Sequence, residues 1–183
     1  FCDGCPVGYS AIGGQTLNPY GRKVFESGGS SSGSGASIAA NYAIAAVGTE
    51  TSGSILSPSS KNSVVGLKPT VGLLSRTGIV PISSTLDTPG PMTRNVIDNA
   101  IFLAAMIGED IDDKATSAIH ETSNYLKDLK SSTLKGKRLG VIKDLLTDSI
   151  YKNTINLLKK AGAIIVEFDP PKLELDGFLT LLN

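Results

Sequence analysis

The sequence has no tryptophan, one histidine, two cysteines, and 17 acidic side chains that balance 17 basic ones. Because the net charge is zero, no strongly basic surface is expected to gather phosphates, and nucleic-acid binding is not predicted. No apolar run approaches the roughly 20 residues that span a bilayer, so no membrane segment is predicted. The N-terminal residues also lack the pattern of a secretory signal. We therefore expect a cytoplasmic globular protein.

The two cysteines, Cys2 and Cys5, form a single C-x-x-C pair at the start of the chain. One such pair is at most half of a zinc site. Pro6 and Gly8 follow at once, which leaves no room for the helix of a redox motif. The expectation is two ordinary thiols in a loop, with no metal and no cofactor.

The distribution of glycine, proline and apolar residues predicts the order of the structural elements. We expect a loop over residues 1–27, a buried helix over 34–46, short strands within 62–75, and a turn over 87–92. Gly48 would end either the helix or a short strand that the helix feeds. Helical spacing over 93–107 predicts a helix with Thr93 as its N-cap and Gly108 as its stop. The last third predicts a strand at 138–142, a helix at about 148–161 ended by Gly162, and a strand at 163–168. This strand, helix, strand order favours an α/β fold.

Two glycine-rich turns hold serines and flank the predicted buried helix. The first is "GGSSSGSG", residues 28–35, and the second is "GTETSGSIL", residues 48–56. Backbone N–H groups in such turns can approach a substrate closely and bind a developing oxyanion. A serine hydroxyl also needs a base before it attacks a carbonyl. The two turns are therefore candidates for the site of a serine hydrolase.

One interpretation of the first turn is the nucleophile elbow of α/β-hydrolases, because Gly29 to Gly33 matches G-x-S-x-G with Ser31 as the nucleophile. That elbow needs an apolar strand before it, and "GRKVFES" supplies only Val24 and Phe25. The histidine of the triad would be His120, which lies in a charged segment that we expect to face solvent. This hypothesis is the less favoured one.

A longer pattern over residues 28–96 closely resembles the core of the amidase signature family of serine hydrolases. The resemblance rests on both serine turns and on the following "GLKPT" and "DTPGPM". It implies an α/β fold with a mixed β-sheet core flanked by helices. Residues 1–110 would form the signature core of a single amidase domain, and 111–183 its more variable strand, helix, strand part.

The resemblance also implies roles for individual residues. Ser54 takes the position of the nucleophile, and Ser30 that of a serine in a cis conformation that relays a proton to a neutral lysine. Ser31 is a candidate for holding this network in place. The oxyanion and substrate-binding positions fall on the second turn, at Thr51, Ser52 and Gly53.

The sequence departs from the family pattern at the lysine. The family lysine lies farther upstream of Ser30 than this sequence extends, and Lys23, the only upstream lysine, has neighbours that do not match. We therefore expect the central portion of a longer amidase domain, inactive by itself. Glu50, Ser52 and Leu56 make the second turn more similar to peptide amidases and cyclic-amide hydrolases than to the subunit that makes amidated tRNA.

The predicted substrate is a small linear or cyclic amide. The alternative from another class is a non-catalytic remnant of the same fold that binds a small amide or a partner subunit. A second copy of the chain, or a complementary segment, is the other expected partner. Asp87 and Arg94 are expected to brace the pocket, Lys68 to belong to a structural turn, and "EDIDDK", residues 109–114, to form a solvated face.

Overall fold

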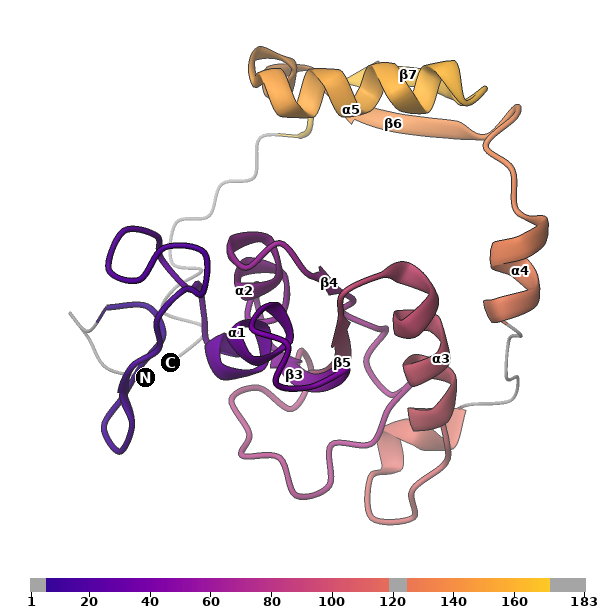
Figure 1. The fold of residues 1–183 in the computed structure, drawn as a ribbon. Coiled ribbons are helices and arrows are strands. Elements are labelled where there is room, and N and C mark those ends of the chain that lie inside the picture. The colour runs from indigo at the N-terminus through magenta and orange to yellow at the C-terminus, as the bar shows by residue number, and fades with distance from the viewer. Residues whose placement is uncertain (1–5, 119–124, 172–183) are drawn as a thin grey trace. The chain divides into compact units, whose positions relative to one another are not determined.

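The structure is a computed structural model that describes residues 6–118 and 125–171. The chain divides into two compact units, Phe1–Lys127 and Asp128–Asn183. Each unit is described by itself (Figure 1). Among the described residues, every helix is too short or too polar to cross a membrane.

The first unit is built on a three-stranded antiparallel sheet with the order β3, β5, β4. The strands are β3 (Ala45–Glu50), β5 (Thr88–Thr93) and β4 (Val65–Gly66). Helices α1 (Ser32–Ala39) and α3 (Val96–Met106) pack against this sheet, and α2 (Leu56–Lys61) contacts α1 and β4 (Figure 1). Between sheet and helices lies a core of fully buried side chains, among them Ile38, Ile55 and Met92.

The remaining elements of this unit lie at its two ends in sequence. A short hairpin joins β1 (Tyr9–Ser10) to β2 (Gly14–Gln15) within the segment that the sequence predicts as loop. A 3-10 helix, η1 (Lys114–Ala118), follows α3, and α4 (Tyr125–Ser131) spans the boundary between the units. Of the strands predicted within 62–75, only β4 forms.

The prediction of a turn over 87–92 is wrong, because residues 88–93 form the central strand β5, with every residue buried. Pro89 and Pro91 explain the error, since proline has no N–H for a ladder and is usually confined to sheet edges. The Pro91 carbonyl accepts from Leu67 N at 3.1 Å, so this residue faces the β4 side. Residues two apart face the same way, so both prolines direct their missing donor toward the short strand β4. The ladder with β3 keeps its donors.

The helix predicted over 34–46 forms and begins within the Gly/Ser run, but it is shorter than predicted, and a strand takes up residues 45–50. Helix α1 begins two residues earlier, at Ser32, and ends at Ala39. Asn41 then takes a positive φ of 62°, and the apolar residues that follow enter β3. Small apolar residues suit a buried helix and a buried strand alike, so their periodicity does not mark the boundary.

Thr93 does not cap α3, which begins at Val96 with Asn95 as its N-cap. The Asn95 side chain accepts from Asp98 N at 2.9 Å. Thr93 is instead the last residue of β5, and its hydroxyl donates to the Asn95 carbonyl at 2.8 Å. The predicted helix exists, with its start moved by three residues.

The second unit confirms the predicted strand, helix, strand order. Strands β6 (Arg138–Ile142) and β7 (Ile164–Phe168) are parallel, and η2 (Lys143–Thr147) and α5 (Ser149–Lys160) connect them. Asp148 caps α5 by accepting from Tyr151 N at 2.8 Å, and Gly162 follows the helix with a φ of 95°. With antiparallel strands in one unit and parallel strands in the other, the α/β fold with mixed sheets and flanking helices is confirmed.

Candidate active site

Ser31 joins the two serine turns. Its backbone N–H donates to the Ser54 carbonyl at 3.1 Å. Its hydroxyl donates to the Thr49 carbonyl at 3.0 Å and accepts from Thr49 N at 3.0 Å. The start of α1 is therefore fixed against the end of β3, and the turn that carries Ser54 lies beside the turn that carries Ser30.

Two glycines allow the backbone to pack closely around the two serine turns. A Cβ atom at Gly28 would lie 2.8 Å from Pro58 Cα, on the backbone of α2. A Cβ atom at Gly48 would lie 2.7 Å from Met92 Sδ and 3.2 Å from Ser31 Cβ. A side chain at Gly28 would collide with the backbone of α2, and one at Gly48 would have to displace Met92 and crowd Ser31.

Among residues 6–118 and 125–171, the hydroxyl groups of Ser30 and Ser54 have no hydrogen-bond partner. The peptide bond between Gly29 and Ser30 is cis, the conformation that the family resemblance implies at this position. Ser30 is exposed and Ser54 is half-buried. In the described part of the chain neither hydroxyl makes a hydrogen bond, so the direct bond of a proton relay is not formed between them.

Glu50 organises the turn that carries Ser54. This buried side chain accepts from Ile55 N at 2.8 Å and from Leu56 N at 3.0 Å through one oxygen, Oε2. The chain therefore turns back at residues 51–54 between β3 and α2. Within residues 6–118 and 125–171, no acceptor bonds the N–H groups of Thr51, Ser52, Gly53 or Ser54. These donors are available to an oxyanion.

Asp87 lies opposite Thr51 and accepts from its hydroxyl at 2.5 Å. The second carboxylate oxygen accepts from Ile82 N at 2.7 Å and Ser83 N at 2.8 Å. Burial raises the pKa of the Asp87 carboxyl, but these hydrogen bonds and the charge of Arg76 outweigh it and hold the pKa below its ordinary value. The expected bracing role fits Asp87, which is an anion at neutral pH.

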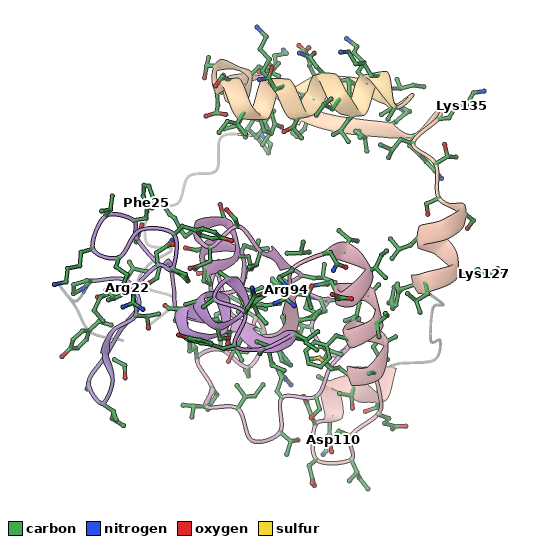
Figure 2. The ribbon with its side chains drawn as sticks, in the orientation of Figure 1. Arg22, Phe25, Arg94, Asp110, Lys127 and Lys135 are labelled. Atoms are coloured by element: carbon green, nitrogen blue, oxygen red, sulfur yellow. The ribbon has the colours of Figure 1, made fainter. Side chains whose placement is uncertain are left out.

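Arg94 contacts a different part of the unit. The side chain of Arg94 is labelled in Figure 2. Its guanidinium donates to Asn41 Oδ1 at 2.7 Å and to the Ala43 carbonyl at 3.3 Å. It therefore braces the connection between α1 and β3. Lys68 donates to the Pro69 carbonyl at 3.3 Å, which agrees with a structural turn.

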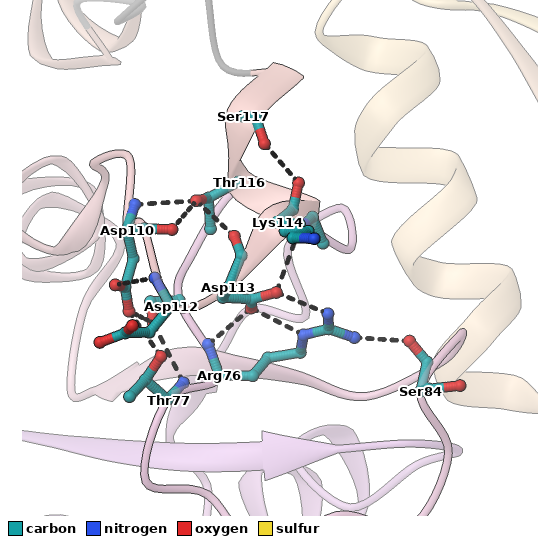
Figure 3. Close-up of polar contacts among 11 residues, drawn as sticks. Arg76, Thr77, Ser84, Asp110, Asp112, Asp113, Lys114, Thr116 and Ser117 are labelled. Atoms are coloured by element: carbon teal, nitrogen blue, oxygen red, sulfur yellow. Dashed lines mark hydrogen bonds and ion pairs between the residues drawn. The ribbon is translucent and has the colours of Figure 1, made fainter.

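The expectation of a solvated face over "EDIDDK" is wrong for Asp113, which is buried, while Asp110 is half-buried and the other four residues are exposed. Asp113 is buried and forms a bidentate ion pair with Arg76, with 2.8 Å to Nε and 2.7 Å to the terminal nitrogen (Figure 3). Asp110 accepts from the hydroxyls of Ser75 and Thr77. Partners 33 to 37 residues apart leave no short-range pattern, so sequence reasoning missed this cluster.

A pocket of about 260 Å³ opens beside the ion pair. Each guanidinium nitrogen of Arg76 already donates one hydrogen bond, to Asp113 or to the Ser84 carbonyl, so the side chain is held in place at the edge of the pocket. Neither Ser30 nor Ser54 lines it. Its lining residues are Arg76, Thr77, Ile79, Pro81, Ser84, Asp87, Asp112 and Asp113.

The elbow interpretation of Ser31 fails on the structure. Residues 21–30 form no strand, and the Ser31 hydroxyl is already bonded to Thr49. His120 lies outside the described residues, as do Cys2 and Cys5. Lys23 is exposed, in a turn with a φ of 63°.

The two joined serine turns on an antiparallel sheet can be set beside known proteins. A family model described as Amidase matches residues 5–176. The chain therefore belongs to the amidase family, the family of the amidase signature.

Individual relatives agree with this assignment. The chain is 47% identical over 164 residues to a probable amidase of Arabidopsis thaliana, covering 88% of this chain and 31% of that protein. It resembles the X-ray structure of native peptide amidase from Stenotrophomonas maltophilia with a TM-score of 0.84 and 45% identity, over 92% of this chain and 36% of that one. It is 39% identical over 165 residues to a glutamyl-tRNA(Gln) amidotransferase subunit of Lawsonia intracellularis, over 86% of this chain and 34% of that protein. The chain thus spans about a third of the length of these relatives.

Proposed function

We propose that the protein hydrolyses a carboxamide C–N bond through a serine acyl-enzyme, with Ser54 as the nucleophile. The observation that carries this proposal is the turn at residues 51–54, which presents the Ser54 hydroxyl beside four N–H groups that lack acceptors in the described structure. Donors fixed in advance around a carbonyl oxygen stabilise the oxyanion that forms during attack.

In this mechanism, Ser30 takes the proton from Ser54 and passes it to a neutral lysine. As Ser54 Oγ bonds to the amide carbon, the carbonyl oxygen becomes an oxyanion held by the N–H groups of residues 51–54. The proton then returns through Ser30 to the departing amine, and the C–N bond breaks. Water repeats the sequence to release the acid. No cofactor takes part.

Ser30 and Ser54 must approach each other for this relay, because their hydroxyls make no hydrogen bond to any described residue. Ser31 supports the arrangement by holding both turns through Thr49 and Ser54. The proposed mechanism requires a lysine that the whole protein would supply. We propose that the 183-residue chain alone is close to inactive. Both units would belong to one amidase domain, which agrees with the family match over 5–176.

The substrate that we propose is a small linear or cyclic amide. The similarity to a peptide amidase supports a peptide amide as the first compound to assay. The second candidate function is binding to a partner without catalysis, because one relative is an amidotransferase subunit. In that case the two turns would bind a partner subunit or a small amide.

A fluorophosphonate probe, which reacts with activated serines, tests this proposal in the full-length natural protein. We expect one labelled residue, Ser54, with labelling and amide hydrolysis both abolished in Ser54→Ala. Ser30→Ala should slow both by at least about 100-fold, the usual contribution of positioned proton transfer. Ser60→Ala, at an exposed serine of α2, is the matched control and should react like the wild type. An unlabelled wild type, or hydrolysis that survives in Ser54→Ala, would overturn the proposal.

A further inference from the structure

We propose that Asp87 is a positioning residue for the nucleophile, which fixes the turn at residues 51–54 through the hydroxyl of Thr51. The inference rests on the proposed function of that turn. It assigns to the carboxylate a role in the rate of reaction at Ser54, in addition to its role in holding the fold.

The register of the sheet places these two side chains opposite each other. Glu50 pairs with Thr88 in the last paired position of β3 and β5. Thr51 and Asp87 are the next residues outward on the two antiparallel strands, and opposite positions carry their side chains on the same face. The bond between them therefore closes the end of the ladder where the chain leaves the sheet and turns toward Ser54.

The three donors to Asp87 come from two segments. Thr51 binds Oδ1, whereas Ile82 N and Ser83 N both bind Oδ2. The carboxylate thus links the turn that carries the nucleophile to the loop at residues 78–86. Because an ionised carboxylate only accepts, it can satisfy all three donors together, which an uncharged side chain of the same shape cannot do.

Glu50 and Asp87 hold different ends of the turn. Glu50 binds Ile55 N and Leu56 N, after Ser54, while Asp87 binds Thr51, before it. The N–H groups of the intervening residues have no acceptor in the described structure, so their direction depends on these two anchors. Loss of the Thr51 anchor frees one end of the oxyanion donors, and a displacement of about 1 Å can cost on the order of 100-fold in rate.

The test compares Thr51→Val with Thr51→Ser in the full-length natural protein. Valine keeps the shape of threonine but lacks the hydroxyl, whereas serine keeps the hydroxyl. We expect Thr51→Val to slow fluorophosphonate labelling of Ser54 and to lower kcat by about 10-fold to 100-fold. KM should change by less than about 3-fold, because the defect lies in the transition state. Thr51→Ser should restore both rates to within about 3-fold of the wild type.

Asp87→Ala should produce the same defect as Thr51→Val. The double variant should be no slower than the slower single variant, because both changes remove one interaction. Thr85→Val and Asp112→Asn, at exposed residues of the same region, are the matched controls and should leave the rates unchanged. If Asp87→Ala does not fold, the Thr51 pair carries the test by itself.

The outcomes separate this inference from the proposed function. If the wild type is labelled at Ser54 and Thr51→Val reacts at the same rate per folded molecule, the inference is overturned while the proposed function stands. A lower melting temperature without a lower rate would also overturn it, because that is the signature of a structural role. A wild type that is not labelled at Ser54 overturns both.

Discussion

Arg76 and Asp113 show how a single pair of side chains fixes a long segment of irregular chain. Arg76 is held by Asp113 through its backbone N–H and two guanidinium nitrogens, and it also donates to the Ser84 carbonyl. The Asp113 side chain is 8% exposed and that of Arg76 is 21% exposed. A bidentate pair of this burial contributes more than an ion pair on the surface. It connects two irregular segments, the one between β4 and β5 and the one after α3.

Asp113→Asn should lower the free energy of unfolding at neutral pH by about 2 kcal/mol, since hydrogen bonds to charged groups contribute roughly that much. The hydrogen bonds from Arg76 hold the pKa of the Asp113 carboxyl well below its ordinary value, despite burial. A depressed carboxyl pKa stabilises the folded state above the unfolded pKa of about 4, and this stabilisation is lost as the pH falls toward the folded pKa. The difference in the free energy of unfolding between the wild type and Asp113→Asn should therefore be constant above about pH 5 and should shrink below about pH 4.

Urea unfolding at neutral and acidic pH measures this difference. The control is Asp112→Asn, at an exposed neighbouring carboxylate. It should change the stability by less than about 0.5 kcal/mol. A difference for Asp113→Asn that grows as the pH falls below about 4 would contradict the assignment, because its sign would be reversed.

At the scale of elements, the sequence predicts a helix or strand best where residues close in sequence determine its start and end. Helix α5 has a capping aspartate before it and a glycine after it, and it was predicted within one residue at each end. Strand β5 was not predicted, because Pro89 and Pro91 are compatible with a central strand only when both face the short neighbour β4. Which neighbouring strand a proline faces is determined by the tertiary structure and not by the local sequence.

In the candidate site too, local sequence patterns were predictable and long-range contacts were not. Ser30 and Ser54 could be named from the two glycine-rich turns and from a family resemblance. The contact of Thr51 with Asp87 spans 36 residues, and it depends on the register of β3 with β5. Because the sequence predicted a turn in place of β5, it could not predict which residue Asp87 would meet.

Gly90→Ala tests the packing of β5. A Cβ atom at this position would overlap the Leu67 carbonyl oxygen and lie 2.8 Å from Ile55 Cδ1. Because a backbone atom cannot move aside as a side chain does, we expect a loss of about 3 kcal/mol, at the upper end for overpacking. Thermal or urea unfolding measures it.

Gly33→Ala in α1 is the matched control. A Cβ atom there meets nothing within 4 Å, so the same substitution should stabilise the helix by about 0.5 to 1 kcal/mol. If Gly90→Ala is as stable as the wild type, β5 cannot lie between β3 and β4 as described.

At the scale of the whole molecule, the family match covers both compact units, although each has its own sheet. The first unit carries both serines and every residue to which we assign a role in the reaction. It also exposes large apolar side chains, such as Tyr42 at 82% and Val80 at 88%. The chain spans about a third of the length of these relatives. The mechanism that we propose needs a lysine as well as these turns, and no lysine among the described residues hydrogen-bonds Ser30 or Ser54.

The last prediction tests that requirement by comparing the isolated 183-residue chain with the full-length natural protein. If the proposed mechanism is right, Ser54 in the isolated chain keeps its turn and its N–H donors but lacks the lysine that would accept its proton through Ser30. Because a positioned base contributes about 10² to 10⁴-fold, fluorophosphonate labelling of Ser54 should be at least about 100-fold slower per folded molecule. Circular dichroism and urea unfolding establish the folded fraction in both samples, and labelling after denaturation gives the background. Equal labelling rates would place the base within the 183 residues and would exclude the division of the site that we propose.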